Sequence, residues 1–385
     1  VLGAVSGMKP FRHEWGTVGS MMAMHGKYKY LDADIPQRDI EFVAAHYATV
    51  TTGCSCDVNR TDAAPTIEAS VQHVAQRVKA VNSDVAVGMY WRVTEANELA
   101  ACSAASAKWA AHPEWRLKDD TGKVIGERGK YMYDFMQPAV ATFFADVLLN
   151  VTAPLLPSGK PVLDFIYLDY GGVPGANKTW ADGVSTARSE ALYNAVGAME
   201  AALVKAMDAR GLGQRVVQNA MDDIDNAAGR VPLGIAGSMF DHFSILQFVN
   251  RTTGDFDVDA MEGAFDLMAS PYVQNQTIQV KGWPGPIIHQ RDEYPPSMPQ
   301  PAAPADKAKI AADRFNSELA LFLLVAGETD FWVYSWFWSW YDSVPGDATS
   351  TIPATWFPQT DCTVGAPLGP PTRGPGFTWT RKFEK

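Results

Sequence analysis

The sequence predicts an α/β protein with the (β/α)8, or TIM-barrel, architecture, and three observations support this prediction. Short runs of apolar, β-branched and aromatic residues recur eight times along the 385 residues. Segments with helical periodicity lie between most of these runs, as parallel strands joined by helical crossovers require. No glycine-rich phosphate-binding turn follows the first run, which disfavours a nucleotide-binding open sheet.

The elements follow in chain order. The predicted strands are Val18–Met24, Tyr47–Thr52, Val85–Trp91, Phe165–Asp169, Arg215–Ala220, Met239–Ile245, Thr277–Lys281 and Phe331–Ser335. The predicted helices are Thr66–Val81, Glu95–Ala110, Pro138–Val151, Gly183–Ala209, Asp257–Met268 and Asp306–Ala326.

Three segments depart from this alternation. Trp115–Ile125 predicts an inserted β-hairpin that turns at Asp120-Thr-Gly122, and the Pro-rich stretch Gly282–Pro304 predicts a long loop over one rim. Residues after Trp340 are rich in Pro, Gly and Thr, and one further strand is predicted at Phe377–Phe383. We therefore expect a catalytic-type barrel over residues 1–340 and a C-terminal extension over 341–385 that packs on it.

The charge balance and apolar runs disfavour several partners. Asp and Glu number 43 against 32 Lys and Arg, so the net charge of −11 disfavours nucleic acid and anionic lipid. No apolar run reaches the roughly 20 residues needed for membrane insertion. The chain has no Gly-x-Ser-x-Gly, no His-Glu-x-x-His and no two-His-one-carboxylate spacing. We expect neither a metal nor a cofactor, and the sequence gives no signal for the oligomeric state.

Sequons and cysteines indicate a secreted protein. Five Asn-x-Thr sequons occur, more than composition alone would give, at Asn59, Asn150, Asn177, Asn250 and Asn275. They predict N-glycosylation and an extracellular or cell-surface location reached through a eukaryotic secretory pathway.

The cysteines are even in number: Cys54, Cys56, Cys102 and Cys362. A direct Cys54–Cys56 bridge would be strained, so we expect these two to bond separately to Cys102 and Cys362. Zinc is the competing interpretation, but the Cys-x-Cys spacing is poor for it.

The candidate catalytic residues are carboxylates at the C-terminal ends of strands, where barrel enzymes build their active sites. Asp169 is the strongest candidate, because an apolar strand runs directly into it and two glycines follow. The alternative is that Asp169 caps the next loop or helix. Asp241, two strands further round, is the second candidate, and Asp222 is held in reserve.

Substrate-binding candidates come from the same strand ends. Indole rings suit stacking on the apolar faces of sugars, and polar groups suit their hydroxyls. The candidates are His25, Trp91, Arg92, Asp134, Tyr170, Asn219, Lys281, Trp336 and Trp338. For Asp134 the alternative, that it organises the turn before the helix at Pro138, is equally favoured.

The order of these motifs resembles a known group of barrels. The segment His112-Pro-Glu-Trp-Arg-Leu-Lys-Asp-Asp-Thr-Gly-Lys123 looks like the "His-Pro-Asp/Glu-Trp…Lys-Asp…Gly" hairpin of glycoside-hydrolase-like barrels of poorly assigned activity. An aromatic-x-x-Asp segment follows at Tyr131–Asp134, and a strand ending in a carboxylate follows at Phe165–Asp169. The resemblance runs from about His25 to the Trp-rich eighth strand, and it implies a (β/α)8 fold with a cleft for sugar polymers.

The resemblance also supports Asp169 as the central carboxylate, whereas such relatives commonly carry Glu where this chain has Asp241. They continue past a strand like Arg381-Lys-Phe383, so we expect an incomplete terminal sheet.

Two functional hypotheses follow. In the first, the protein is a secreted glycoside hydrolase acting on a polysaccharide, with Asp169 as nucleophile or base and Asp241 as acid. In the second, it is a non-catalytic carbohydrate-binding or structural glycoprotein of the cell surface or matrix that keeps the barrel. A polysaccharide lyase with Tyr170 or His25 as base is a third option.

Overall fold

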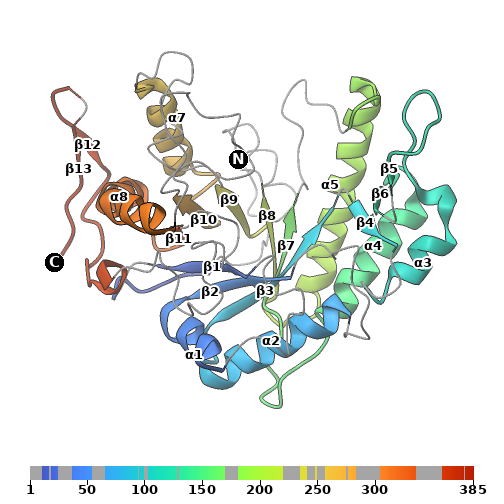
Figure 1. Ribbon diagram of the computed structural model, residues 1–385, viewed down its shortest axis with the longest axis horizontal. Helices are drawn as coiled ribbons and strands as arrows, with labels where there is room; N and C mark the ends of the chain where they lie inside the picture. The colour runs from blue at the N-terminus through green and yellow to red at the C-terminus, as the bar shows by residue number, and fades with distance from the viewer. Residues whose placement is uncertain are drawn as a thin grey trace.

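A closed ring of parallel strands is the centre of the protein (Figure 1). The computed structural model describes residues 11–16, 19–24, 37–53, 66–93, 95–98, 103–127, 130–169, 181–219, 235–240, 248, 256–274, 276–282, 304–334, 358–376 and 378–385. The strands of the ring, in spatial order, are β1 (Met21–Met24), β2 (Thr49–Thr52), β3 (Ala86–Arg92), β7 (Phe165–Asp169), β8 (Arg215–Asn219), β9 (Gly237–Phe240), β10 (Thr277–Gly282) and β11 (Asp330–Tyr334).

The first and last strands meet and close the ring. Ser20 and Trp332 form a parallel bridge, and the Trp332 amide donates a hydrogen bond of 2.8 Å to the Gly19 carbonyl. All neighbouring strand pairs within the sheet are parallel. The predicted (β/α)8 fold is therefore confirmed, and each of the eight predicted strands overlaps one strand of the barrel.

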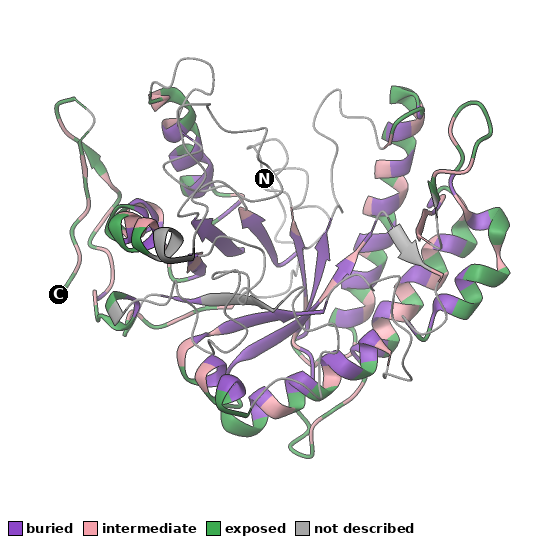
Figure 2. Ribbon diagram, in the orientation of Figure 1, coloured by how far each residue is buried: buried purple, intermediate pink, exposed green. Residues whose placement is uncertain are grey.

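Helices cover the outer face of the barrel, and their buried sides face the strands (Figure 2). They are α1 (Gln37–His46), α2 (Ile67–Val81), α4 (Pro138–Val151), α5 (Thr186–Asp208), α7 (Val258–Ala269) and α8 (Pro304–Val325). Local signals explain several starts: Thr66 caps α2, Pro138 opens α4, and Asp257 caps α7 by accepting from the Ala260 amide at 2.9 Å.

Because helices cover one face of the sheet and side chains fill the other, the strands are buried on both faces. All five residues of β7 are buried, as are all six of β10. The interior contains a cluster built from Phe165, Tyr167, Val217, Met239 and Phe331, among others. Gly88 of β3 makes room for this cluster, because a Cβ there would lie within 2.4 Å of the Phe165 ring.

Between β3 and α4 the chain leaves the barrel and forms a small antiparallel sheet in the order β4 (Glu95–Asn97), β6 (Lys130–Met132) and β5 (Gly126–Glu127). The short helices α3 (Ser106–Ala111) and η1 (Pro113–Trp115) lie in the same excursion. An antiparallel bridge joins Lys118 and Val124 across the turn at Gly122.

One helix prediction needs correction, and one helix was missed. The segment predicted as one helix over Glu95–Ala110 begins instead with β4, because residues 95–97 pair with β6 and tertiary pairing overrides helical periodicity. Helix α1 was not predicted.

The C-terminal segment contains η6 (Pro358–Asp361) and the two-stranded ribbon β12 (Thr372–Arg373) and β13 (Trp379–Thr380). The Arg381 guanidinium donates to the carbonyls of Leu323 at 3.0 Å and Ala326 at 2.6 Å, which ties the ribbon to the end of α8. Trp379 packs edge-on against Phe265 of α7.

Candidate functional site

The strand register decides which side chains enter the barrel at its C-terminal end. Tyr167 and Val217 belong to the interior cluster, so the residues two positions further along β7 and β8, Asp169 and Asn219, also point inward. On β3, Tyr90 is paired with Tyr167 and Arg92 with Asp169. The register therefore gathers Tyr90, Arg92, Asp169 and Asn219 on one inner wall.

Asp169 is held by donors from both neighbouring strands. The Tyr90 hydroxyl on β3 donates to Asp169 Oδ2, and the Asn219 amide on β8 donates to Asp169 Oδ1 at 2.7 Å. The Asp169 carbonyl also accepts from the Val93 amide at 2.9 Å. With only 7% of its surface exposed, Asp169 is a buried carboxylate that these donors hold in a fixed orientation. Such a group can act as a nucleophile or a base.

Lysine 281 faces the same interior from β10. Ile278 and Val280 lie in the outer cluster beneath α7 and α8, so the alternate residues Gln279 and Lys281 face inward. Lys281 is 1% exposed, and it is paired in register with Val333 of β11. Arg92 and Lys281 therefore bring two cationic side chains to the barrel interior, Arg92 on β3 beside Asp169 and Lys281 on β10, three strands further round from β7.

Trp91 is not part of this wall, which corrects its prediction as a sugar-binding residue. Because Tyr90 and Arg92 point inward, Trp91 between them points outward. It is 9% exposed and meets Phe144 of α4 edge-on, with ring centroids 6.4 Å apart. Trp91 is a core residue between barrel and helices.

Asp134 lies in the turn before α4. Its Oδ1 accepts from the Met136 amide at 3.1 Å, and the Gln137 side-chain amide lies 3.5 Å from Oδ2. These contacts organise the turn, the second of the two roles that the sequence left open.

Several predicted residues lie outside the described part of the chain. These are His25, Tyr170, Asp222, Asp241, Trp336, Trp338, the sequons at Asn59, Asn177, Asn250 and Asn275, and the cysteines Cys54, Cys56 and Cys102. Asn150 is exposed near the end of α4. Cys362 is exposed and free, so the disulfide predicted for it is not formed in this structure.

Sequence reasoning missed Tyr90, the donor to Asp169 Oδ2. The signal was present, because Tyr90 lies in the predicted strand Val85–Trp91 and Arg92 follows it directly, and a period of two puts both on the same face. The residues predicted from this strand, Trp91 and Arg92, lie at its end, whereas Tyr90 lies one position earlier.

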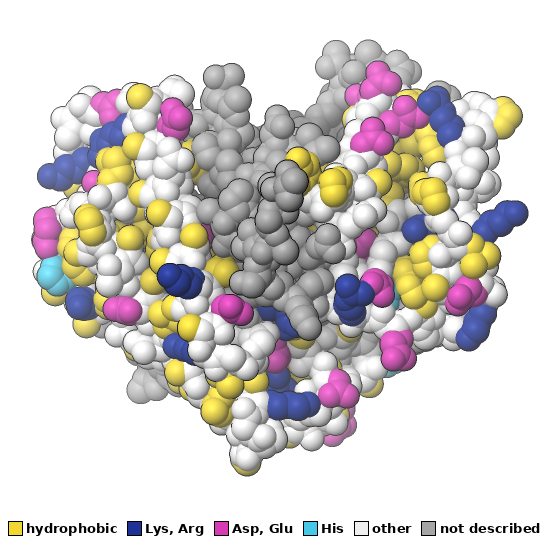
Figure 3. Space-filling view, turned by 180° about the vertical axis from the view of Figure 1, so that it is seen from behind, with side chains coloured by type: hydrophobic (Ala, Val, Ile, Leu, Met, Phe, Trp, Pro, Cys, Tyr) yellow, Lys and Arg dark blue, Asp and Glu magenta, His cyan; other side chains and the backbone are white. Residues whose placement is uncertain are grey.

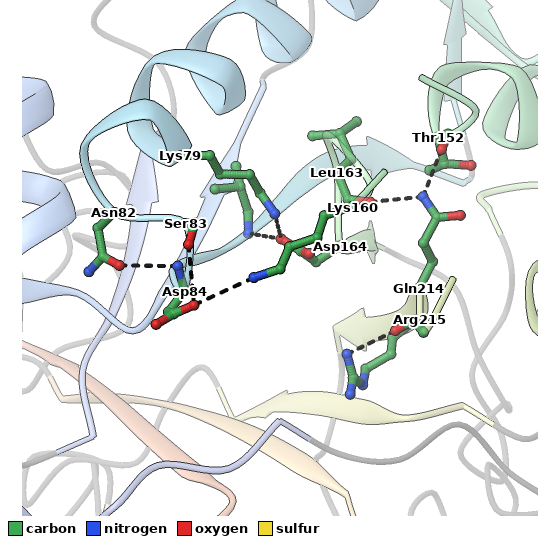
Figure 4. Close-up of polar contacts among 12 residues, drawn as sticks. Lys79, Asn82, Ser83, Asp84, Thr152, Lys160, Leu163, Asp164, Gln214 and Arg215 are labelled. Carbon is green, nitrogen blue, oxygen red and sulfur yellow. Dashed lines mark hydrogen bonds and ion pairs between the residues drawn. The ribbon is translucent and has the colours of Figure 1, made fainter. Parts of the chain in front are cut away.

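The opposite end of the barrel carries a different polar network (Figure 4). Asp164, just before β7, accepts from the Lys79 ammonium at 2.7 Å and from the Val87 amide at 2.7 Å. Burial raises the pKa of Asp164 above its usual value, and the Lys79 charge offsets part of that rise. Gln214 donates to the carbonyls of Thr152 and Leu163 at 2.7 and 2.9 Å. These contacts join the C-terminal end of α2 to the N-terminal ends of β3, β7 and β8.

In the part of the chain that the structure describes, no group of three or more His, Cys, Asp or Glu side chains is arranged to hold a metal ion. Among the described helices, none combines the length and apolar character that crossing a membrane requires. Lys and Arg lie interspersed with Asp and Glu on the face shown in Figure 3.

Comparison with known proteins gives likeness at the level of fold. No family model matches the sequence, and no curated protein matches it. The structure is similar to a GH36 α-galactosidase, AgaA, from Geobacillus stearothermophilus, with 10% identity, a TM-score of 0.43, and coverage of 83% of this chain and 39% of that one. An α-galactosidase from Lactobacillus brevis gives 11% identity, a TM-score of 0.41, and coverage of 83% and 38%.

A family GH13_31 enzyme gives 8% identity, a TM-score of 0.45, and coverage of 70% of this chain and 59% of the other. The chain thus spans about two fifths to three fifths of the length of these proteins. These likenesses concern the fold alone, and the (β/α)8 barrel itself is shown by the strand topology of this chain. At these identities and TM-scores the likeness carries nothing about the reaction, so the function has to be argued from the site.

Proposed function

We propose that the protein is a secreted glycoside hydrolase that acts on a polysaccharide, with Asp169 as nucleophile or base. One observation carries the proposal: a buried carboxylate stands at the C-terminal end of a barrel strand, points inward and is oriented by Tyr90 and Asn219. A carboxylate that only caps a loop would turn toward backbone amides of that loop. Asp169 instead accepts from side chains of the two adjacent strands.

Glycoside hydrolysis needs a second carboxyl group to protonate the leaving oxygen, and we assign this role to Asp241, with Asp222 in reserve. In an active enzyme one of them should approach Asp169 to about 5–5.5 Å for a retaining reaction or 6.5–9.5 Å for an inverting one. A crystal structure in which no second carboxyl group lies within about 5 to 9.5 Å of the Asp169 carboxylate would contradict the proposal.

The substrate contacts follow from the inner wall. Arg92, Asn219 and Lys281 would bind hydroxyl or acidic groups of the sugar, with His25 and Tyr170 at the same rim. Trp336 and Trp338 would stack on sugar rings. An extracellular or cell-surface location rests on the five sequons, of which Asn150 is exposed on the barrel surface.

The test is reducing-end release from a panel of neutral and acidic polysaccharides by the wild type and Asp169→Asn. Asparagine keeps the shape of the side chain, and its amide can donate to the Tyr90 oxygen while its carbonyl still accepts from Asn219. We expect activity to fall by roughly 10⁴-fold, the scale of losing a group that acts directly on the substrate.

The matched control is Asp164→Asn, the same change five residues earlier at the other end of β7. Assayed well below its melting temperature, it should release sugar at nearly the wild-type rate. Equal activity of wild type and Asp169→Asn would move the catalytic centre elsewhere. No release from any polymer, with glycan binding kept by both proteins, would favour the non-catalytic binding protein.

A further inference from the structure

Tyr90 differs from the neighbouring Tyr167 of the barrel interior in what its hydroxyl contacts. It lies on β3 in register with Tyr167 of β7, and the two rings stack with centroids 5.8 Å apart and an interplanar angle of 22°. The Tyr167 hydroxyl bonds to the Met239 sulfur at 2.8 Å, within the core. The Tyr90 hydroxyl bonds instead to the carboxylate of Asp169.

The stack fixes the direction of the Tyr90 hydroxyl. Tyr167 is 3% exposed and belongs to the interior cluster, so it is a rigid surface for the Tyr90 ring. Gly88, two residues before Tyr90 on the same face, leaves the space that the Phe165 ring fills below the pair. A phenol held in this way keeps its hydroxyl at the end of β7 without losing side-chain entropy each time the bond forms.

We propose that Tyr90 is the positioning residue of Asp169, and that its hydroxyl fixes the carboxylate plane and favours its ionised form. This inference rests on the proposed function. The bond to Oδ2 from β3 and the bond to Oδ1 from β8 hold the carboxylate across its own strand, so that it cannot rotate about its Cβ–Cγ bond. Tyr90 keeps its proton throughout, because its role is to donate a hydrogen bond.

The proposal predicts a change in pH dependence. A hydrogen bond to a charged acceptor stabilises the ionised form, so its loss requires a higher pH to generate the active carboxylate. In Tyr90→Phe, the acid limb of the kcat/KM profile should move toward higher pH by about one unit, a tenfold change in the ionisation equilibrium. We expect kcat to fall roughly 10-fold or more with little change in KM, because orientation matters at the transition state.

Tyr167→Phe is the matched control. It removes one hydroxyl from the same stacked pair, but this hydroxyl contacts Met239. A general loosening of the pair would move the pH profile in both variants, whereas a role through Asp169 moves it in Tyr90→Phe alone. Equal profiles for wild type and Tyr90→Phe would overturn the proposal, and so would equal shifts in the two variants.

A second measurement separates this inference from the proposed function. The protein is labelled with ¹³C at the Asp carboxyl carbons, and the NMR signal of Asp169 is identified as the one missing from Asp169→Asn. This signal is then followed as a function of pH in the wild type, Tyr90→Phe and Tyr167→Phe. A midpoint that rises in Tyr90→Phe alone supports the positioning role even if no polymer is hydrolysed. Unchanged midpoints reject that role even if the wild type is an active hydrolase.

A further variant covers the case in which Tyr90→Phe fails to fold. Site-specific replacement of Tyr90 by 3-fluorotyrosine keeps the ring and the hydroxyl but makes the phenol a stronger donor. The acid limb and the carboxyl titration should then move to lower pH, opposite to Tyr90→Phe. Absence of a shift, or a shift to higher pH, would reject the proposal.

Discussion

Two aspartates on one strand, Asp164 and Asp169, stand at opposite ends of the barrel and have different partners. Asp164 is neutralised by the Lys79 ammonium and also accepts from a backbone amide. Asp169 accepts from a phenol and a side-chain amide, both neutral. Both are shielded from solvent, so burial alone does not distinguish them.

The difference teaches that the type of partner, more than burial, separates a structural carboxylate from a reactive one. In a shielded site, a direct ion pair between Lys79 and Asp164 holds α2 against β7. Removing one partner would leave the other as a buried charge without compensation, which is costly. Tyr90 and Asn219 instead orient Asp169 in the barrel interior, where the proposed function needs a carboxylate. The proposed function places the reaction at Asp169, in line with the rule that barrel enzymes act at the C-terminal ends of their strands.

The largest expected effect is a loss of stability when Asp164, at the N-terminal end of β7, is replaced. Asp164→Ala leaves the Lys79 ammonium, whose side chain is 2% exposed, without its counter-charge. The free energy of unfolding should fall by about 3 to 5 kcal/mol, measured by chemical denaturation. Lys160→Ala is the control, because the Lys160–Asp84 pair on the same end is 3.7 Å long and exposed. That change should cost under about 0.5 kcal/mol, and equal losses in the two variants would contradict the distinction.

A second effect concerns Asp330, a carboxyl group at the N-terminal end of β11 whose pKa is raised by burial. Asp330 accepts from the Gly327 amide at 2.7 Å, and burial raises its pKa from 3.8 to about 7 against smaller opposing effects of that hydrogen bond and of Arg381. The folded protein therefore holds a proton there that the unfolded chain releases above pH 4. Stability should fall as pH rises from about 4 to about 7, by up to about 4 kcal/mol.

Asp330→Asn should remove most of this pH dependence and make the protein more stable than the wild type at pH 8, as measured by thermal unfolding across pH. Asp313→Asn is the control, since Asp313 is an exposed carboxylate paired with Lys309 on α8. An unaltered pH dependence in Asp330→Asn would show that Asp330 is ionised in the folded protein.

The smallest expected effect is on stability and comes from replacing Trp91, which lies on the outer face of β3. Trp91→Phe removes volume from the packing against Phe144, so the free energy of unfolding should fall by about 1 to 2 kcal/mol. KM should stay unchanged, because Trp91 faces the helices. A raised KM with unchanged stability would restore Trp91 as a sugar-binding residue.

Much of the barrel was predictable because its strands are short, apolar and regularly spaced. Phe165–Asp169 and Pro138–Val151 were predicted with the bounds that the structure shows, since an all-apolar run and an N1 proline are strong local signals. Glu95–Ala110 failed because a helical pattern in the sequence competed with strand pairing to residues more than thirty positions away. Local periodicity holds no information about that partner.

The sequence by itself determined the order of the elements and the choice of Asp169, because burial patterns and a carboxylate at a strand end are local properties of the chain. Only the tertiary structure decided the neighbours of that carboxylate. Strand register places Tyr90 and Asn219, 79 and 50 residues away in the chain, on either side of Asp169, and it turns Trp91 out of the barrel. These outcomes depend on which strands lie side by side, and that is settled when the ring closes between Ser20 and Trp332.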